Sequence, residues 1–157
     1  MFGRIRNKAN RLMNNILNQG CEFLSAKALG IEHAEWEALI KTLWWLEHGK
    51  LPHTEVENPT FTEFFAYSGT DTPKIDGFNM LVWSSRGEEC GTVCCIGGTA
   101  SHFLGRKITM NHSLFDLFHP YEISNWSKIT PVHAAHALRN YLTTGRAQWK
   151  KAIKRKT

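Results

Sequence analysis

An apolar repeat marks the clearest structural element of the chain. Its members recur at intervals of three, four and three residues: Trp36, Leu39, Leu43 and Leu46. This spacing places them on one face of an α-helix, because 3.6 residues make one turn. Glutamates crowd the first turns, where the helix dipole favours anions. Gly49 fits the position just past the end of the helix, and Pro52 follows it. The segment predicts an amphipathic helix with one buried face.

Capping residues and glycines divide much of the remaining chain into further helices. Thr130 followed by Pro131 begins a helix that Gly145 ends, and Gly30 and Gly105 each end an earlier one. We expect about five to seven helices, near residues 2–16, 22–29, 36–46, 61–67, 92–104, 113–118 and 130–143. Residues 150–157 are interpreted as a frayed basic tail. The predicted fold class is therefore mainly α.

One short strand completes the predicted architecture. Phe78, Met80 and Val82 alternate with their neighbours as residues of a half-buried strand do. We therefore expect a strand or hairpin around residues 78–84. The 157 residues of the chain favour one globular domain over residues 1–157. A chain of this length buries enough surface for a sizeable core.

The distribution of apolar residues and cysteines indicates a cytoplasmic protein. No apolar run approaches the ~18 residues that a membrane span requires, and the basic N-terminus lacks the apolar stretch of a signal peptide. Cys90, Cys94 and Cys95 are crowded together, unlike a spaced disulfide framework. We expect reduced thiols, no membrane partner and no location outside the cytoplasm.

Charge is distributed unevenly along the chain. Residues 1–30 carry five basic and one acidic side chain, residues 31–99 carry four and eleven, and residues 100–157 carry ten and two. One interpretation is internal: the basic ends lie across the acidic middle. The other is external: the basic ends form a surface for nucleic acid or an acidic protein. The sequence leaves both open.

The segment from Cys90 to Ala100 is the most unusual in composition, and its first interpretation is structural. Cysteine packs like a small hydrophobe and is among the most buried residue types. Gly97 and Gly98 each weaken a helix by about 1 kcal/mol relative to alanine. Such glycines persist where another backbone comes very close, so this interpretation needs a tight helix crossing and no chemistry.

Two chemical interpretations compete with the structural one. Cys90 just before a helix would have a thiol activated by the helix dipole, and a histidine such as His102 would serve as base. The neighbouring Glu88 and Glu89 oppose this, since carboxylates raise the pKa of a thiol. A metal site would need ligands from the cysteines and His102, but no second ligand pair with zinc spacing is present. We expect neither a metal nor a cofactor, and there is no phosphate-binding loop.

The sequence also resembles a family of small, uncharacterised bacterial and phage proteins. The motifs that carry the resemblance span roughly residues 35–150. They comprise Phe78-Asn79-Met80 with Trp83, Cys90-Gly91-Thr92, Cys94, Gly97, Ala100, Leu117-Phe118-His119-Pro120, Ile129-Thr130-Pro131, Ala134-Ala135, Leu138, Thr144-Gly145 and Trp149. The resemblance implies a prokaryotic or phage source and a compact helical domain. It implies no catalytic residue.

The leading functional prediction is a non-enzymatic accessory protein that binds an acidic protein or the backbone of a nucleic acid. Binding is assigned to basic residues of both termini: Arg4, Arg6, Lys8, Arg11, Lys150, Lys151, Lys154, Arg155 and Lys156. An exposed aromatic patch would add specificity. Trp44 and Trp45 are adjacent and cannot share a helical face, so one of them is the expected patch, whereas Phe115, Leu117 and Phe118 are expected in the core. The alternative is a cysteine-dependent hydrolase or transferase with Cys90 as nucleophile and His102 as base.

Overall fold

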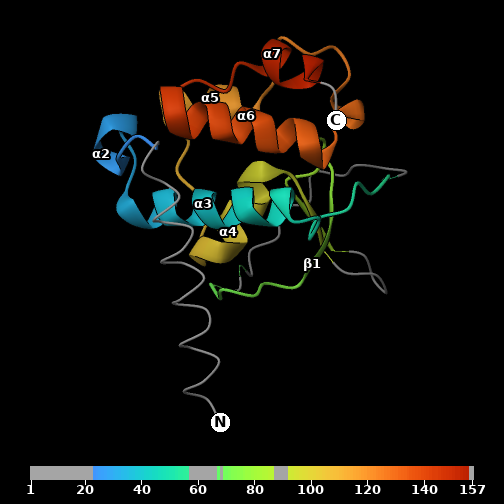
Figure 1. Cartoon of the computed structure of the whole chain (residues 1–157). Helices are drawn as coiled ribbons and strands as arrows, with labels where there is room; N and C mark the ends of the chain where they lie inside the picture. Colours follow the sequence, from blue (N-terminus) through green and yellow to red (C-terminus); the bar gives the residue numbers. More distant parts are fainter. Residues whose placement is uncertain (1–22, 57–66, 68, 87–91, 156–157) are drawn as a thin grey trace.

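The structure is a computed structural model that describes residues 23–56, 67, 69–86 and 92–155 (Figure 1). Within these ranges the helices are α2 (Ala26–Leu29), α3 (His33–Glu47), α4 (Ile96–Leu104), α5 (His112–Phe118), α6 (Pro131–Thr144) and α7 (Trp149–Lys154), with the 3-10 turn η2 (Trp126–Lys128). The strands are β1 (Ile75–Phe78), β2 (Ser84–Arg86) and β3 (Thr92–Cys94). A mainly α fold with a short sheet is therefore confirmed.

The helix ends follow from local side-chain chemistry. The Thr130 side chain accepts a hydrogen bond from the backbone N–H of His133, and Pro131 occupies the first turn of α6. Gly145 ends α6 with φ of 80°, a left-handed conformation that glycine adopts without a Cβ penalty. The start and end predicted for this helix are confirmed.

The helices pack in layers around a shared core. α3 contacts α4 on one side and α6 on the other, while α7 packs against α6 (Figure 1). Leu39, Leu43 and Leu46 of the apolar repeat are buried in this core, and Trp36 packs against it. The repeat therefore predicted the buried face of α3 correctly. The core joins residues from every helix of the described part.

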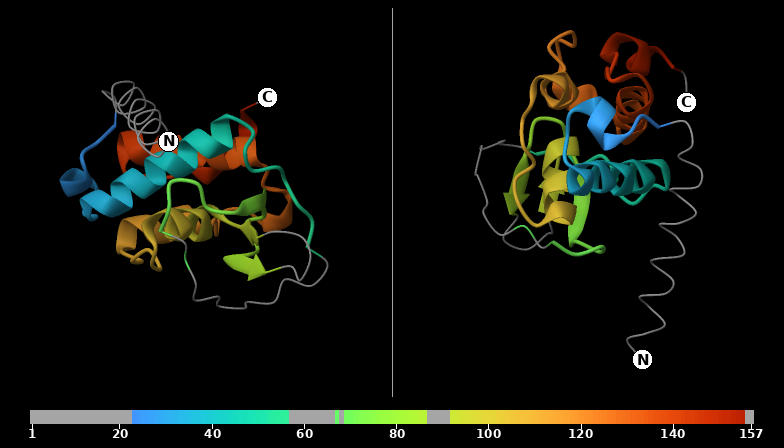
Figure 2. Two further views of the ribbon diagram at one scale, coloured as in Figure 1. Left: turned by 90° about the horizontal axis from the view of Figure 1, so that it is seen from below. Right: turned by 90° about the vertical axis from the view of Figure 1, so that its left-hand side faces the viewer.

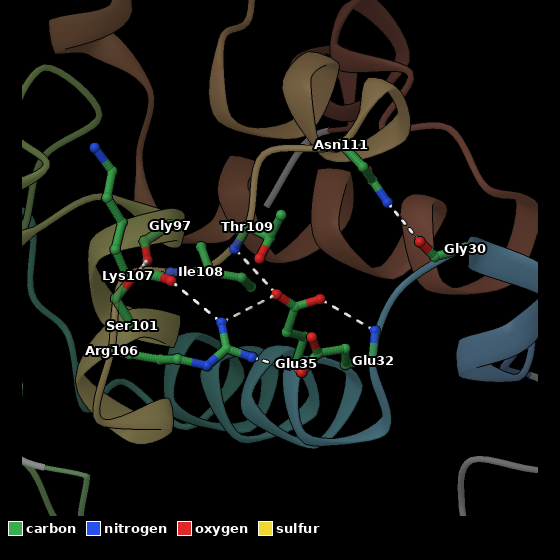
Figure 3. Close-up of polar contacts among 10 residues, drawn as sticks. All are labelled: Gly30, Glu32, Glu35, Gly97, Ser101, Arg106, Lys107, Ile108, Thr109 and Asn111. Atoms are coloured by element: carbon green, nitrogen blue, oxygen red, sulfur yellow. Dashed lines mark hydrogen bonds and ion pairs between the residues drawn. The ribbon is translucent and has the colours of Figure 1, made fainter.

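A buried carboxylate ties the loop before α5 to the start of α3 (Figure 3). Glu35 is 2% exposed. Its Oε1 accepts hydrogen bonds from the backbone N–H of Thr109 at 3.0 Å and from Arg106 at 3.5 Å, and its Oε2 accepts from the backbone N–H of Glu32 at 3.1 Å. Asn111, at the end of this loop, donates to the carbonyl of Gly30 and caps α5. The network thus fixes the position of α5.

Burial and hydrogen bonding act in opposite directions on the pKa of Glu35. Burial alone would raise the pKa of this carboxyl, since it disfavours the charged form. The backbone N–H groups of Thr109 and Glu32, together with the Arg106 guanidinium, outweigh burial and hold the pKa below its ordinary value. Glu35 is therefore a structural anion at neutral pH.

The small sheet contains both ends of the predicted segment 78–84, at Phe78 in β1 and Ser84 in β2, but not the residues between them. β3 is its central strand, parallel to β1 and antiparallel to β2. β1 ends at Phe78, and residues 79–83 form a turn in which the Asn79 side chain accepts from the backbone N–H of Leu81 at 2.9 Å. Asn79 closes the turn in the way short polar side chains do, so the alternation that predicted a strand over 78–84 belongs mostly to a turn.

The helix predicted over residues 92–104 begins four residues late. Thr92–Cys94 form β3, whose backbone pairs with strands on both sides, and α4 starts only at Ile96. The helix ends at Leu104 with Gly105 in a left-handed conformation, as predicted. The residue at the start of α4 is therefore Cys95, and the expectation that Cys90 lies just before a helix is wrong.

Most of the segment predicted as a frayed tail belongs to the helix α7, which ends at Lys154. Trp149 and Ala152 of α7 are buried in the core, so hydrophobic burial stabilises this short helix as far as Lys154. The helices predicted near residues 2–16 and 61–67 lie outside the described residues, apart from Tyr67. No helix in the described ranges is long and apolar enough to cross a membrane.

Candidate functional site

A cleft of about 460 Å³ lies between the C-terminal end of α5 and the corner that joins α6 to α7. Figure 2 (right) shows α5 and α7 side by side above α6. The first side is formed by residues of α5 and of the loop after it: Asp116, His119, Tyr121 and Glu122. The second is formed by residues 146–151. The volume falls in the range of roughly 300–1,000 Å³ typical of ligand sites.

The α6–α7 corner is built by two backbone conformations and two hydrogen bonds. After Gly145, Gln148 also adopts a left-handed conformation (φ 51°), the one non-glycine residue to do so in the described part. Asn140 of α6 donates to the carbonyl of Ala147 at 3.1 Å. The Trp149 indole donates to the carbonyl of Asp116 at 2.8 Å, which connects α7 directly to α5. The two sides of the cleft are therefore held at a fixed separation.

Four rings form a continuous cluster beside the cleft, which we call the ring cluster: Phe115, His119, Tyr121 and Trp126. Phe115 and His119 are stacked with centroids 4.6 Å apart, and His119 and Tyr121 are stacked at 5.9 Å. Tyr121 is 64% exposed and Phe115 38%. Contacts with neighbouring rings therefore orient Tyr121 while much of its ring stays in solvent.

His119 joins the ring cluster to the cleft. Its Nδ1 is buried and has no hydrogen-bond partner among the described residues. The tautomer that carries its proton on Nε2 avoids burying an unpaired N–H at Nδ1. In that tautomer the Nε2–H remains as a donor for a bound group.

Unpaired cations dominate the second side of the cleft and continue beyond it. Five exposed basic residues lie within residues 146–155, and we call them the basic stretch: Arg146, Lys150, Lys151, Lys154 and Arg155. None of the five forms an ion pair with a carboxylate of the described residues. Arg146, Lys150 and Lys151 line the cleft, whereas Lys154 and Arg155 extend the positive charge along α7.

Some basic residues fit the internal interpretation of the charge pattern, and others fit the external one. Arg106 pairs with Glu32 and Glu35, and Arg139 pairs with Glu47 at 2.6 Å. These arginines connect the basic C-terminal third to the acidic middle, as the internal interpretation predicts. The basic stretch takes no part in this pairing and remains an external positive surface.

The predicted binding residues fall into two groups. Lys150 and Lys151 lie at the cleft, and Lys154 and Arg155 lie beside it on the same basic stretch. The others lie outside the described residues: Arg4, Arg6, Lys8, Arg11 and Lys156. Arg146 was missed, although its position just after the helix-ending Gly145 indicated an exposed corner.

The exposed aromatic patch also differs from the predicted one. Trp44 stacks on His48, and Trp45 packs edge-on against Phe103 and the core, so neither is an exposed indole. Leu117 and Phe118 are buried as predicted, but the prediction for Phe115 was wrong. The spacing of these rings could have predicted their contact, because Phe115 and His119 are four residues apart and so share a helical face.

The cysteine-rich segment has a structural role in the described residues. Cβ atoms added at Gly97 would lie 2.5 Å from the Trp83 ring, and at Gly98 2.7 Å from the Trp83 carbonyl carbon. The close backbone approach predicted for these glycines is therefore present at Gly98, where the partner is the turn before β2 and not a second helix. At Gly97 the close neighbour is the Trp83 side chain. Cys94 and Cys95 are both buried, and Cys95 is a free thiol. Burial raises the pKa of the Cys95 thiol to about 11, so this thiol at the start of α4 is not activated.

The structure describes one of the two residues of the alternative enzyme hypothesis, His102. His102 is buried on α4, where burial lowers its pKa and its ring lies edge-on to Tyr67 with centroids 5.1 Å apart. Cys90 lies outside the described residues. In the part of the chain that the structure describes, no group of three His, Cys, Asp or Glu side chains is placed to hold a metal ion.

No protein-family model, no curated protein and no solved structure matches the chain. The fold and the site define it as a mainly α protein with a small mixed sheet and a cleft that combines exposed rings with cations that have no ion-pair partner among the described residues.

Proposed function

We propose that the protein is a non-enzymatic module that binds nucleic acid at the cleft between α5 and α7. The observation that carries the proposal is the basic stretch, whose five cations are exposed and unpaired among the described residues. Elsewhere Arg106 and Arg139 have carboxylate partners. Cations that neutralise phosphates release condensed counterions, and this release supplies most of the affinity of sequence-independent binding.

The acidic residues of the same cleft favour nucleic acid over an acidic protein. Asp116 and Glu122 are the acidic side chains of residues 100–157, and both line the cleft. An acidic peptide would bring its carboxylates close to these two. A nucleotide presents phosphates to the cations, and amino groups of its base can donate to the carboxylates. The cleft therefore fits the mixed chemistry of a nucleotide better than uniform negative charge.

The same proposal places the protein in the cytoplasm. Its support is that Cys95 is a free thiol, as is usual in a reducing compartment.

Neutralising Lys150 and Lys151 together tests the proposal. We expect the double variant Lys150→Gln, Lys151→Gln to bind a short fluorescent DNA oligonucleotide more weakly than the unmodified protein. The slope of log affinity against log salt should fall by about 1 for each lysine, because each lost phosphate contact removes one released counterion. Fluorescence anisotropy at several salt concentrations measures both quantities.

A second pair of exposed lysines outside the cleft provides the control. The variant Lys50→Gln, Lys74→Gln removes the same charge from the surface but leaves the basic stretch intact. It should keep the original salt slope. If both double variants lowered the slope equally, net charge alone would explain binding. Binding that does not weaken with salt would contradict the proposal, and salt-sensitive binding of an acidic peptide but not of DNA would replace nucleic acid with a protein partner.

A further inference from the structure

The geometry of the ring cluster points to a more specific ligand: we propose that the cleft holds an unpaired base of a single-stranded nucleic acid, stacked on Tyr121, with adjacent phosphates on the basic stretch. This inference rests on the proposed function and names the form of nucleic acid. It follows from where the exposed ring lies relative to the cations and carboxylates.

The exposed ring of Tyr121 is held in place before a ligand arrives. His119 stacks on it at 5.9 Å with an interplanar angle of 15°, and Phe115 and Trp126 contact it with centroids 5.5 and 6.3 Å away. A flexible surface tyrosine would lose side-chain freedom when a base stacked on it. Because neighbouring rings already limit this freedom, the entropic cost of binding is small.

Stacking requires a base whose face is free. In a duplex both faces of each base are covered by neighbouring base pairs, so an exposed ring gains nothing from a duplex without opening it. In a single strand the face of each base is available to an aromatic side chain, and a positive groove follows the backbone. The ring cluster and the basic stretch supply these two parts on opposite sides of one cleft.

The polar groups of the cleft match the edge of a stacked base. Asp116 and Glu122 accept hydrogen bonds, and the amino groups of cytosine, adenine and guanine donate them. His119, as the Nε2–H tautomer, supplies a donor on the same side. Tyr121 and Glu122 are adjacent in the chain, so the stacking ring and one carboxylate are presented together.

The extent of the basic stretch favours a strand over a free nucleotide. A single nucleotide in a cleft of about 460 Å³ would meet Arg146, Lys150 and Lys151. Lys154 and Arg155 lie further along α7 and do not line the cleft. Several successive phosphates are needed to reach all five cations, and a strand provides them.

The test compares Tyr121→Ala with the unmodified protein on two probes of the same sequence. One probe is a fluorescent single-stranded 12-mer, a length on the order of the 4–16 nucleotides that a small single-strand-binding domain covers. The other probe is the corresponding duplex. We expect the unmodified protein to prefer the single strand. Tyr121→Ala should weaken single-strand binding about 5- to 150-fold, the effect of losing one stacked base, and leave duplex binding unchanged.

Two variants show whether a loss belongs to the ring. Tyr121→Phe keeps the stacking surface and should retain single-strand affinity. Met110→Ala removes another exposed apolar side chain, outside the cleft, and should also bind normally. Because Tyr121 is mostly exposed, its replacement is expected to leave thermal stability unchanged, which a melting curve of the same sample verifies.

The outcomes separate this inference from the proposed function. Equal, salt-sensitive binding of both probes by the unmodified protein and by Tyr121→Ala would overturn the stacked base and keep nucleic-acid binding. Binding of neither probe would overturn both. If excess AMP displaced the strand as effectively as an unlabelled strand at equal phosphate concentration, the ligand would be a free nucleotide and the strand would be excluded.

Discussion

Replacing Gly98 with alanine is expected to destabilise the protein by about 3 kcal/mol. Alanine is ordinarily the better helix former and would stabilise α4 by about 1 kcal/mol relative to glycine. Here the added Cβ would lie 2.7 Å from the carbonyl carbon of Trp83, closer still to its oxygen, and 3.2 Å from the Cβ of Cys94. Most of these neighbours are backbone, so they cannot rotate away as a flexible side chain would.

Helix propensity and the steric contact predict opposite signs for the change in stability, so the measurement distinguishes them. Urea unfolding of the unmodified protein and of Gly98→Ala gives the difference in free energy of unfolding. A large loss of stability confirms that the turn containing Trp83 is seated directly on α4. A gain, as helix propensity alone predicts, would mean that this backbone approach is absent and that the cysteine-rich segment has another role.

Replacing Glu35 with alanine is expected to cost about 2–3 kcal/mol of stability at neutral pH. The change removes the acceptor of two backbone N–H bonds and of one Arg106 bond, and hydrogen bonds to a charged group contribute about 1.5–3 kcal/mol. Glu37→Ala is the matched control on the same helix. Glu37 pairs with His33 at the surface, and such pairs contribute about 0–1 kcal/mol.

The dependence on pH identifies the carboxylate as the cause. The pKa of Glu35 is lowered in the folded protein, so its ionisation stabilises the fold above the unfolded pKa of about 4.3. That contribution is lost as the pH falls through the folded pKa. Glu35→Gln keeps the volume but not the charge. Its stability should therefore fall below that of the unmodified protein at pH 7 and approach it in acid; an equal difference at both pH values would rule out the charge as the cause.

Local signals predicted the helices but not the contacts that build the site. The ends of α6 are determined by capping at Thr130, Pro131 and Gly145. Capping involves residues that are neighbours in the chain, so the sequence shows it directly. The strand β3 escaped prediction, because its three residues are stabilised by pairing with the separate strands β1 and β2. Residue patterns do not record such partners.

The cleft was predicted in part for the same reason. Lys150 and Lys151 were identified from charge alone, since a basic run needs no tertiary contact to be visible. Asp116, Tyr121 and Glu122 reach the same cleft because α7 packs beside α5, where the Trp149 indole donates to the carbonyl of Asp116 across 33 residues of sequence. Their role becomes apparent once that hydrogen bond is in place.

The most direct test of nucleic-acid binding at this cleft is a ¹H–¹⁵N correlation spectrum of the labelled protein, recorded while a single-stranded oligonucleotide is added. The chain has six tryptophans, whose indole N–H signals are reporters spread over the fold. Trp149 lines the cleft and Trp126 belongs to the ring cluster, whereas the Trp36 indole is bonded to the carbonyl of Leu24 near the start of α3. We expect shifts at Trp126 and Trp149 with Trp36 unchanged; shifts at Trp36 alone, or at no indole, would contradict binding at this cleft.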